Sequence, residues 1–334
     1  MSGETSLYRM SGAAWLVLYI QTKRVVSAAA RRTPMALSML SGDEQGIVLF
    51  QLYNVFDPRL AVDFSSVSHE VWEPTRALLQ QLRADHKAAA ALGHKAGMRS
   101  CKEMREAKEI KWMGKALSET DLATLGTLGS VLPALERLEL LDSPTRVLRT
   151  HWGMLRLAER LGAGALQALT YFATNFVRVG NAGASALAAA LDRGALPQLK
   201  ELYLGNAAIG DVGLMGLASA LRWRPTLERL ILWRNPFGDK GIAALVAPPP
   251  PQVAPSPPTR LLAKLKELDL EDTHVTDAGC AVLAAALDSG ALPDLTRLEL
   301  GNIPASAAAK AAVYEARGNL VHNASGSGSD SDSY

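Results

Sequence analysis

The stretch "LPQLKELYLGNAAIGDVGL", residues 196–214, decides the fold of this chain. Leucines recur at Leu199, Leu202 and Leu204, and the segment then passes through a Gly-Asn turn that begins at Gly205. A single amphipathic helix is excluded, because the leucines are too closely spaced for one apolar stripe and glycines would interrupt it. A short strand that ends at Leu204 and is followed by a helix fits the pattern.

The same leucine spacing recurs along the chain. It reads "LERLEL" from Leu135, "LERLIL" from Leu227, "LKELDL" from Leu265 and "LTRLEL" from Leu295, with a weaker copy "LTYFAT" from Leu169 and another, "AKEIKW", from Ala107. Self-similarity at a fixed period indicates a repeat architecture in which each unit packs on its neighbours. The sequence therefore predicts seven units, which start at Ala107, Leu135, Leu169, Leu199, Leu227, Leu265 and Leu295.

Each strand is followed by a turn and an Ala/Leu-rich run, such as "IGDVGLMGLASAL", "FGDKGIAALVA" and "VTDAGCAVLAAAL". We expect these runs to be helices. Asp211, Asp239 and Asp277 stand where an N-cap or first-turn acid satisfies free amides and the helix dipole. Two helices should end at Gly194 and Gly290, which serve as C-terminal stops.

The pattern "LxxLxLxxN", followed by "xIGDxG" and "ALAxAL", resembles the ribonuclease-inhibitor type of leucine-rich repeat. The resemblance covers residues 107–317. It implies an α/β leucine-rich-repeat solenoid, with short parallel strands on the concave face and helices on the convex face. The family's turn asparagine matches only at Asn235. Ala207, Thr273 and Ser143 replace it elsewhere, so we expect those turns to be less rigidly bonded.

The chain outside the repeats divides by composition. We predict a disordered or targeting leader over residues 1–41, a helical region over 42–106 and a disordered tail over 318–334. The apolar run "AAWLVLYI" in the leader is shorter than the roughly 20 residues that cross a bilayer. A proline-rich insertion over residues 247–259 should form an extended loop within the repeat domain of residues 107–317.

Residues 42–72 weakly resemble an F-box. The order of Leu52, Phe56 to Pro58, Leu60, Phe64, Val67, Ser68 and Trp72 follows that family, although Trp72 falls about one residue late and the usual opening proline is missing. The resemblance implies binding to the adaptor of a cullin-type ubiquitin ligase. The alternative is a helical cap that covers the first repeat, which solenoids require, and we expect the cap.

Composition and motifs argue against several classes of function. The net charge of +2 disfavours a nucleic-acid binder, and we expect no membrane partner. Two cysteines, Cys101 and Cys280, lie far apart without metal-ligand spacing, as in a reduced cytoplasmic or nuclear protein. Phosphate-binding, zinc-protease and serine-hydrolase motifs are absent from the sequence, and its histidines are scattered. We therefore expect no enzyme, no cofactor and no metal.

Residues between the strand leucines should point outward on the concave face. The predicted protein-binding residues are Tyr171, Tyr203, Arg229, Trp233, Arg234, Glu267, Asp269, Glu271 and Asp272, with Arg137, Glu139, Asn175, Glu201, Arg297 and Glu299 on the same face. Tyr, Trp and Arg dominate binding energy in interfaces, so we favour a contact centre at Tyr203, Trp233 and Arg234. The acidic run from Glu267 to Asp272 should select a basic partner surface.

Three functions follow. The first is a non-enzymatic scaffold that binds a protein of unknown identity through the concave face. The second is a substrate receptor of a ubiquitin ligase, through the F-box-like segment. The third resembles the Ran GTPase-activating proteins, which use the same repeat type, have a strongly acidic tail and carry a catalytic arginine on an early repeat loop. This chain's tail is only weakly acidic, and neither Arg146 nor Arg149 can be assigned to that role.

Overall fold

The structure is a computed structural model. It describes residues 41, 45–46, 48–49, 52–66, 69–113, 117–141, 152–222, 224–247 and 262–321. The predicted leader up to residue 40, the proline-rich insertion from residue 248 and the predicted tail from residue 322 lie outside these residues. The described chain forms two compact units, Met1–Ala91 and Leu92–Tyr334.

The first unit contains α4 (Arg59–Ser65) and most of α5 (His69–Lys95), a helix that continues into the second unit. Its apolar side chains are well covered. Phe64, Leu79 and Leu82 are at most 1% exposed. The helical content predicted for this region is confirmed, whereas its role as a cap or an F-box stays a prediction.

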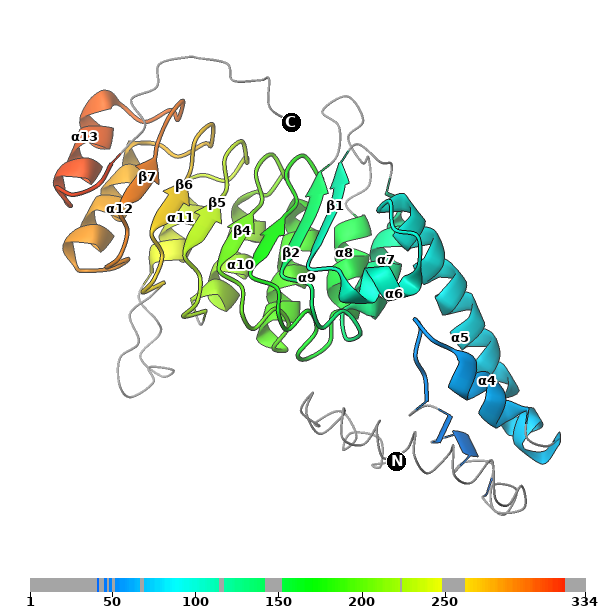
Figure 1. Ribbon diagram of the computed structural model, residues 1–334. Coiled ribbons are helices and arrows are strands. Elements are labelled where there is room, and N and C mark those ends of the chain that lie inside the picture. Colours follow the sequence, from blue (N-terminus) through cyan, green and yellow to red (C-terminus); the bar gives the residue numbers. More distant parts are fainter. Residues whose placement is uncertain are drawn as a thin grey trace. The chain divides into compact units, whose positions relative to one another are not determined.

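The second unit holds one seven-stranded parallel sheet in which the strands follow one another in sequence order (Figure 1). The strands are β1 (Glu109–Met113), β2 (Arg137–Leu141), β3 (Tyr171–Ala173), β4 (Glu201–Tyr203), β5 (Arg229–Ile231), β6 (Glu267–Asp269) and β7 (Arg297–Glu299). Every strand pairs with the next, and the pairs keep the leucine register, as Leu202↔Leu230 and Leu230↔Leu268 show. The prediction of seven stacked units is confirmed.

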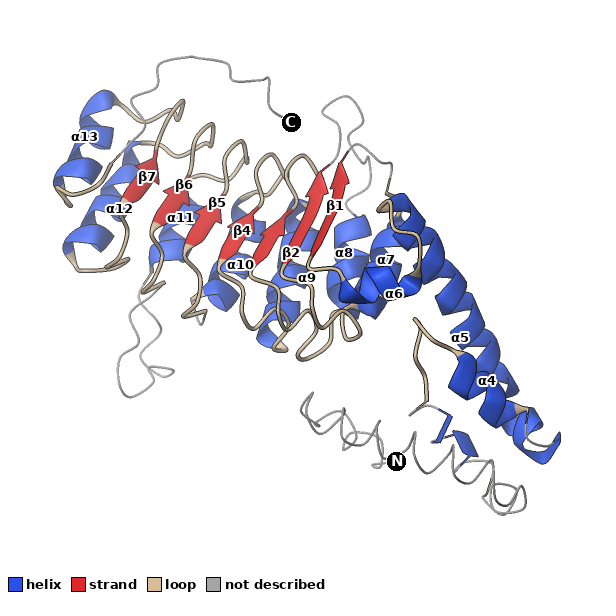
Figure 2. Cartoon of the chain, viewed as in Figure 1, coloured by secondary structure: helices blue, strands red, loops and turns tan. Residues whose placement is uncertain are grey.

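Helices cover one side of this sheet and leave the other side open (Figure 2). They are α6 (Cys101–Glu106), α7 (Glu119–Leu128), α8 (Trp152–Arg160), α9 (Gly180–Asp192), α10 (Asp211–Leu221), α11 (Asp239–Val246), α12 (Asp277–Asp288) and α13 (Ala307–Glu315). We call the open side the sheet face; it corresponds to the predicted concave face. Helices α9 and α12 stop before glycines with positive φ, Gly194 at 90° and Gly290 at 82°, as predicted.

The core lies between the sheet and the helices. The leucines of the repeat pattern fill it, and Leu202, Leu204, Leu230, Leu232, Leu268 and Leu270 are all 0% exposed. An isolated repeat would leave its apolar side exposed to water. These side chains are covered because neighbouring repeats stack on one another. Before the first strand, the end of α5 lies against the first repeat, where Lys95 forms an ion pair with Asp121 of α7.

The predicted helix-start acids are confirmed as first-turn residues, but their carboxylates also serve the next repeat. Asp211 Oδ1 accepts hydrogen bonds from the amides of Gly238 and Gly241, both at 2.8 Å. Asp239 accepts from the amide and the hydroxyl of Thr276. Asn181, one repeat before Asp211, and Asp277, one repeat after Asp239, make the equivalent bonds. These bonds form a ladder that joins successive helix N-termini.

The turn asparagine acts as predicted. Asn235 is 1% exposed; its Oδ1 accepts from the amides of Ala207 and Ile209, and its Nδ2 donates to the carbonyls of Leu204 and Leu232. At the equivalent position Thr273 makes a single side-chain bond, in which Oγ1 donates to the Leu270 carbonyl at 2.7 Å. Ala207 can make none, and Ser143 lies outside the described residues.

Candidate functional site

The sheet face is organised in columns, because the parallel register aligns equivalent residues of all seven strands. The first column precedes the central buried residue of each strand, which is Ile110 in β1, Phe172 in β3 and a leucine in the others; this column contains Glu109, Arg137, Tyr171, Glu201, Arg229, Glu267 and Arg297. The second follows that residue and contains Lys111, Glu139, Ala173, Tyr203, Ile231, Asp269 and Glu299. Most residues predicted for the concave face therefore lie together on this face. Two other members of the second column, Ile231 and Ala173, are buried.

Charges alternate in the first column and pair across strands. Arg229 lies between Glu201 at 3.5 Å and Glu267 at 3.2 Å, and Arg297 bonds to the other side of Glu267 at 3.5 Å. Exposed ion pairs contribute little to stability, typically about 0–1 kcal/mol each. The effect of these ion pairs is on position, because they hold each long side chain in one place over the strands.

Two tyrosines occupy the middle of the face. The rings of Tyr171 and Tyr203 lie 4.8 Å apart between centroids, and the Arg137 guanidinium lies 3.5 Å from the Tyr171 centroid. Burial, followed by the nearby carboxylate of Glu139, raises the pKa of Tyr171 to about 12. Both hydroxyls therefore remain protonated at neutral pH, and the Tyr203 hydroxyl donates to Glu201 at 3.0 Å.

Trp233 lies in the turn after β5 and is partly packed. A Cβ placed on Gly205 would lie 2.3 Å from two atoms of the indole, so the ring rests directly on this glycine. Phe176 contacts the same ring edge-on at 5.4 Å. The indole is therefore half-buried against its neighbours and offers one side to solvent, rather than projecting freely.

Arg234 follows the tryptophan and is exposed. Its guanidinium lies 5.4 Å from the indole centroid, and its Nε donates to Asp272 Oδ2 at 2.9 Å. The equivalent turn position in five repeats has a positive φ, including 63° at Phe176 and 52° at Arg234. The left-handed turn directs these side chains outward beside the strands. Phe176 was missed in the sequence, although it shares the repeat offset of Arg234 and Asp272.

The acidic residues gather over β6 and β7. Burial, followed by the carboxylates of Glu271, Glu299 and Glu267, raises the pKa of Asp269 to about 6. A hydrogen bond from the Glu271 amide to Asp269 opposes this effect only in part. Glu267 is held by Arg229 and Arg297, whereas no cationic side chain of the described residues is within ion-pair distance of Asp269.

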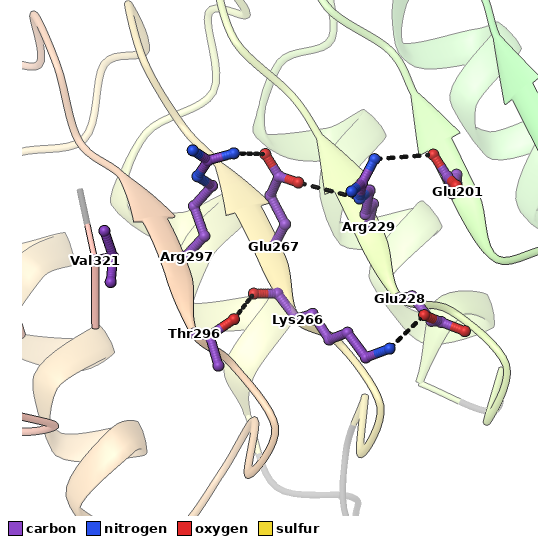
Figure 3. Close-up of a pocket in the computed structure, with 8 residues that line it drawn as sticks. All are labelled: Glu201, Glu228, Arg229, Lys266, Glu267, Thr296, Arg297 and Val321. Carbon is purple, nitrogen blue, oxygen red and sulfur yellow. Dashed lines mark hydrogen bonds and ion pairs between the residues drawn. The ribbon is translucent and has the colours of Figure 1, made fainter. Parts of the chain in front are cut away.

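A hollow of about 470 Å³ opens at the start of strands β4 to β7 (Figure 3). It is lined by Glu201, Glu228, Arg229, Lys266, Glu267, Thr296, Arg297 and Val321. The charges that line it are paired with one another, as in the 2.6 Å contact between Lys266 and Glu228. Such a balanced rim can contact a polar partner but contains no nucleophile placed beside a base.

The described ranges contain neither a metal-ligand cluster nor a candidate membrane-spanning helix. No group of three or more His, Cys, Asp or Glu side chains is arranged there to hold a metal ion. Among the same residues no helix is both long enough and apolar enough to span a membrane. Arg146 and Arg149, considered above as catalytic arginines, lie outside the described residues.

Among the described residues of the F-box-like segment, most of the apolar side chains that would contact an adaptor are covered. Leu52, Phe56 and Phe64 are buried at 2%, 7% and 1% exposure, and Leu60 is only partly exposed. Val67 and Ser68, which belong to the F-box signature, lie outside the described residues. Burial of these side chains weighs against a contiguous apolar docking patch.

Comparisons with known proteins agree with the repeat fold. A family model described as a leucine-rich repeat matches residues 196–218, 225–246 and 262–284. Ribonuclease inhibitor from Sus scrofa is 32% identical over 109 residues, which cover 33% of this chain and only 22% of that relative. The matched units are leucine-rich repeats, and this part of the chain distantly resembles ribonuclease inhibitor; neither match supports an F-box.

Proposed function

We propose that this chain is a non-enzymatic scaffold that binds a protein partner through the sheet face of its repeats. The observation that carries the proposal is the cluster of Tyr171, Tyr203 and Trp233 over β3 to β5, bordered by the exposed guanidinium groups of Arg229 and Arg234. Tyrosine, tryptophan and arginine are the residue types that contribute most to binding energy at protein interfaces.

The cluster is ordered before a partner arrives. Tyr203 is held by Glu201 and by the Tyr171 ring, and Trp233 is held by Gly205 and Phe176. Immobilising a side chain on binding costs roughly 0.5–1.5 kcal/mol, so side chains that are already fixed lose less. A rigid aromatic surface of this kind favours recognition of a folded protein.

The acidic end of the face supports a basic partner surface. Glu267, Asp269, Glu271 and Asp272 lie on or beside β6, next to the aromatic cluster. Complementary charge increases the association rate and disfavours partners of the same charge. We propose that the partner places an apolar contact over β3 to β5 and lysine or arginine side chains over β6.

The test compares two substitutions with the same change of charge. Arg234→Glu alters the sheet face, whereas Lys240→Glu alters an exposed position on α11. The tagged full chain is used for proximity labelling with quantitative mass spectrometry, and circular dichroism checks that each variant is folded. We expect Arg234→Glu to reduce recovery of specific partners about tenfold, which corresponds to about 1.4 kcal/mol.

Lys240→Glu should leave that recovery unchanged. Loss of the same partners in both variants would show that the sheet face is not their binding site. Retention of every partner by Arg234→Glu would remove the proposed contact centre. The ligase-receptor and GTPase-activating alternatives receive no specific support from the described residues.

A further inference from the structure

The outer edge of β7 is the last strand edge of the described sheet. The backbone of Arg297 and Glu299 bonds to repeat six, as the 2.9 Å and 3.0 Å bonds to Lys266 and from Leu270 show. In a parallel strand alternate residues bond to opposite neighbours. The carbonyl of Thr296, both backbone groups of Leu298 and the amide of Leu300 therefore face away from β6. An exposed row of this kind is a template for pairing with another chain.

Val321 satisfies the first two of these groups. Its amide donates to the Thr296 carbonyl at 2.8 Å, and its carbonyl accepts from the Leu298 amide at 3.3 Å. This is an isolated parallel bridge with Arg297 rather than a strand. The Val321 side chain is 58% exposed, so its backbone rather than its packing makes the contact.

Tyr314 satisfies the other two groups from α13. Its hydroxyl donates to the Leu298 carbonyl at 3.1 Å, and the same hydroxyl has a backbone hydrogen bond with Leu300. If another strand paired with β7, its next peptide group would supply one donor and one acceptor at this place. The Tyr314 hydroxyl supplies both instead. Burial raises the pKa of Tyr314 to about 12, so the hydroxyl keeps its proton at neutral pH.

The position of Tyr314 is fixed at both ends of α13. At the helix start, the Ser306 amide and hydroxyl both donate to the Asp277 carboxylate. Just beyond the helix end, Arg317 Nη2 donates to the Ala291 carbonyl at 2.7 Å. Between them, Val313 is 0% exposed. The phenol is thus held in place by the bonds between the last two repeats.

We propose that Tyr314 and Val321 form an edge cap that prevents β7 from accepting a strand of a second copy of this chain. The phenol hydroxyl replaces one peptide group and Val321 provides another, so the four outward backbone groups are satisfied without a further strand. The cap lies on the sheet edge, away from the aromatic cluster. The inference is therefore independent of the proposed binding function.

The test removes the hydroxyl alone. In the full chain, Tyr314→Phe should accelerate hydrogen exchange of the Leu300 amide at least tenfold, while the Leu298 amide, bonded to Val321, serves as internal reference. Sedimentation should show concentration-dependent self-association of the variant. Tyr53→Phe is the matched control, because its hydroxyl donates to Asp85 within the first unit, outside the repeat sheet; it should sediment like the native chain.

A second variant tests the edge cap without changing a buried side chain. Val321→Pro removes the amide that donates to Thr296 but leaves the core intact, because the side chain is largely exposed. It should accelerate exchange of the Leu298 amide and also self-associate. Unchanged Leu300 exchange in Tyr314→Phe would show that the hydroxyl does not cover the edge. Faster exchange with both variants still monomeric would show that the cap does not prevent association, and either result overturns the proposal.

Discussion

At the scale of the residue, Asp269 shows how a side chain can be destabilising in the free protein. Its carboxyl is largely covered on β6 and lies near Glu271, Glu299 and Glu267, so its pKa rises from 3.8 to about 6. A buried carboxylate that lacks a cation is costly, and like charges nearby add to the cost. The same feature would favour a basic partner, because a cation would relieve both effects.

We therefore expect Asp269→Asn to stabilise the chain at pH 7. Between about pH 4 and 6 Asp269 binds more protons in the folded state than in the unfolded state, so its own contribution to stability falls as the pH rises through this window. The asparagine side chain keeps an oxygen that accepts the hydrogen bond from the Glu271 backbone amide, but it cannot ionise. Urea unfolding at a series of pH values should show a gain at pH 7 that disappears near pH 4. An equal gain at both pH values would contradict this origin.

At the scale of the element, the helix N-termini are joined by the ladder of side-chain bonds. Each carboxylate accepts from two groups of the next repeat, as Asp239 does from Thr276. This requires a close approach, and a glycine stands at the third position of α10, α11 and α12 to permit it. The motif "DxG" that these three helices share thus combines an acceptor with the space that its neighbour needs.

Gly279→Ala tests this requirement. Its Cβ would lie 2.3 Å from Asp239 Oδ1 and 2.7 Å from Val275 Cγ1. Overpacking of this kind typically costs about 1–3 kcal/mol, which outweighs the helix-propensity gain of roughly 0.5–1 kcal/mol. Gly216→Ala on α10 is the control, because the nearest atom to its Cβ is the rotatable Ser185 Oγ at 3.2 Å. Chemical denaturation should show a loss for Gly279→Ala and a gain of up to about 1 kcal/mol for the control, from helix propensity alone; a similar effect in both variants would dismiss the ladder argument.

At the scale of the whole molecule, stability is distributed among neighbouring repeats. Each repeat supplies only a three- to five-residue strand and one helix, and the buried leucines of one repeat contact those of the next. Solenoid stability is approximately a sum of repeat terms and interface terms. A defect in a central repeat therefore weakens two interfaces at once.

Leu232→Ala should expose this coupling. Leu232 is 0% exposed in the fifth repeat, and truncation of a buried leucine costs roughly 2–5 kcal/mol. Val212→Ala on α10, whose side chain is 67% exposed, should stay within about 0.5 kcal/mol of the native protein. Urea denaturation measures both. A loss below about 1 kcal/mol for Leu232→Ala would count against a continuous leucine core.

The repeat, the number of strands, their order and the buried leucines could be predicted from the sequence, because the spacing of apolar residues and the Gly, Asp and Asn signals are local properties of the chain. The alternation along each strand also predicted which side chains point away from the core, and their role in binding stays a prediction. What those residues contact depended on the tertiary structure. Trp233 rests on Gly205, and Asp239 bonds to Thr276 of the next repeat, because both contacts join residues about 30 to 40 positions apart. The hydroxyl of Tyr314 reaches the edge of β7 because α13 folds back onto the strand of its own repeat, 16 positions earlier, and no local pattern of residues signals that contact.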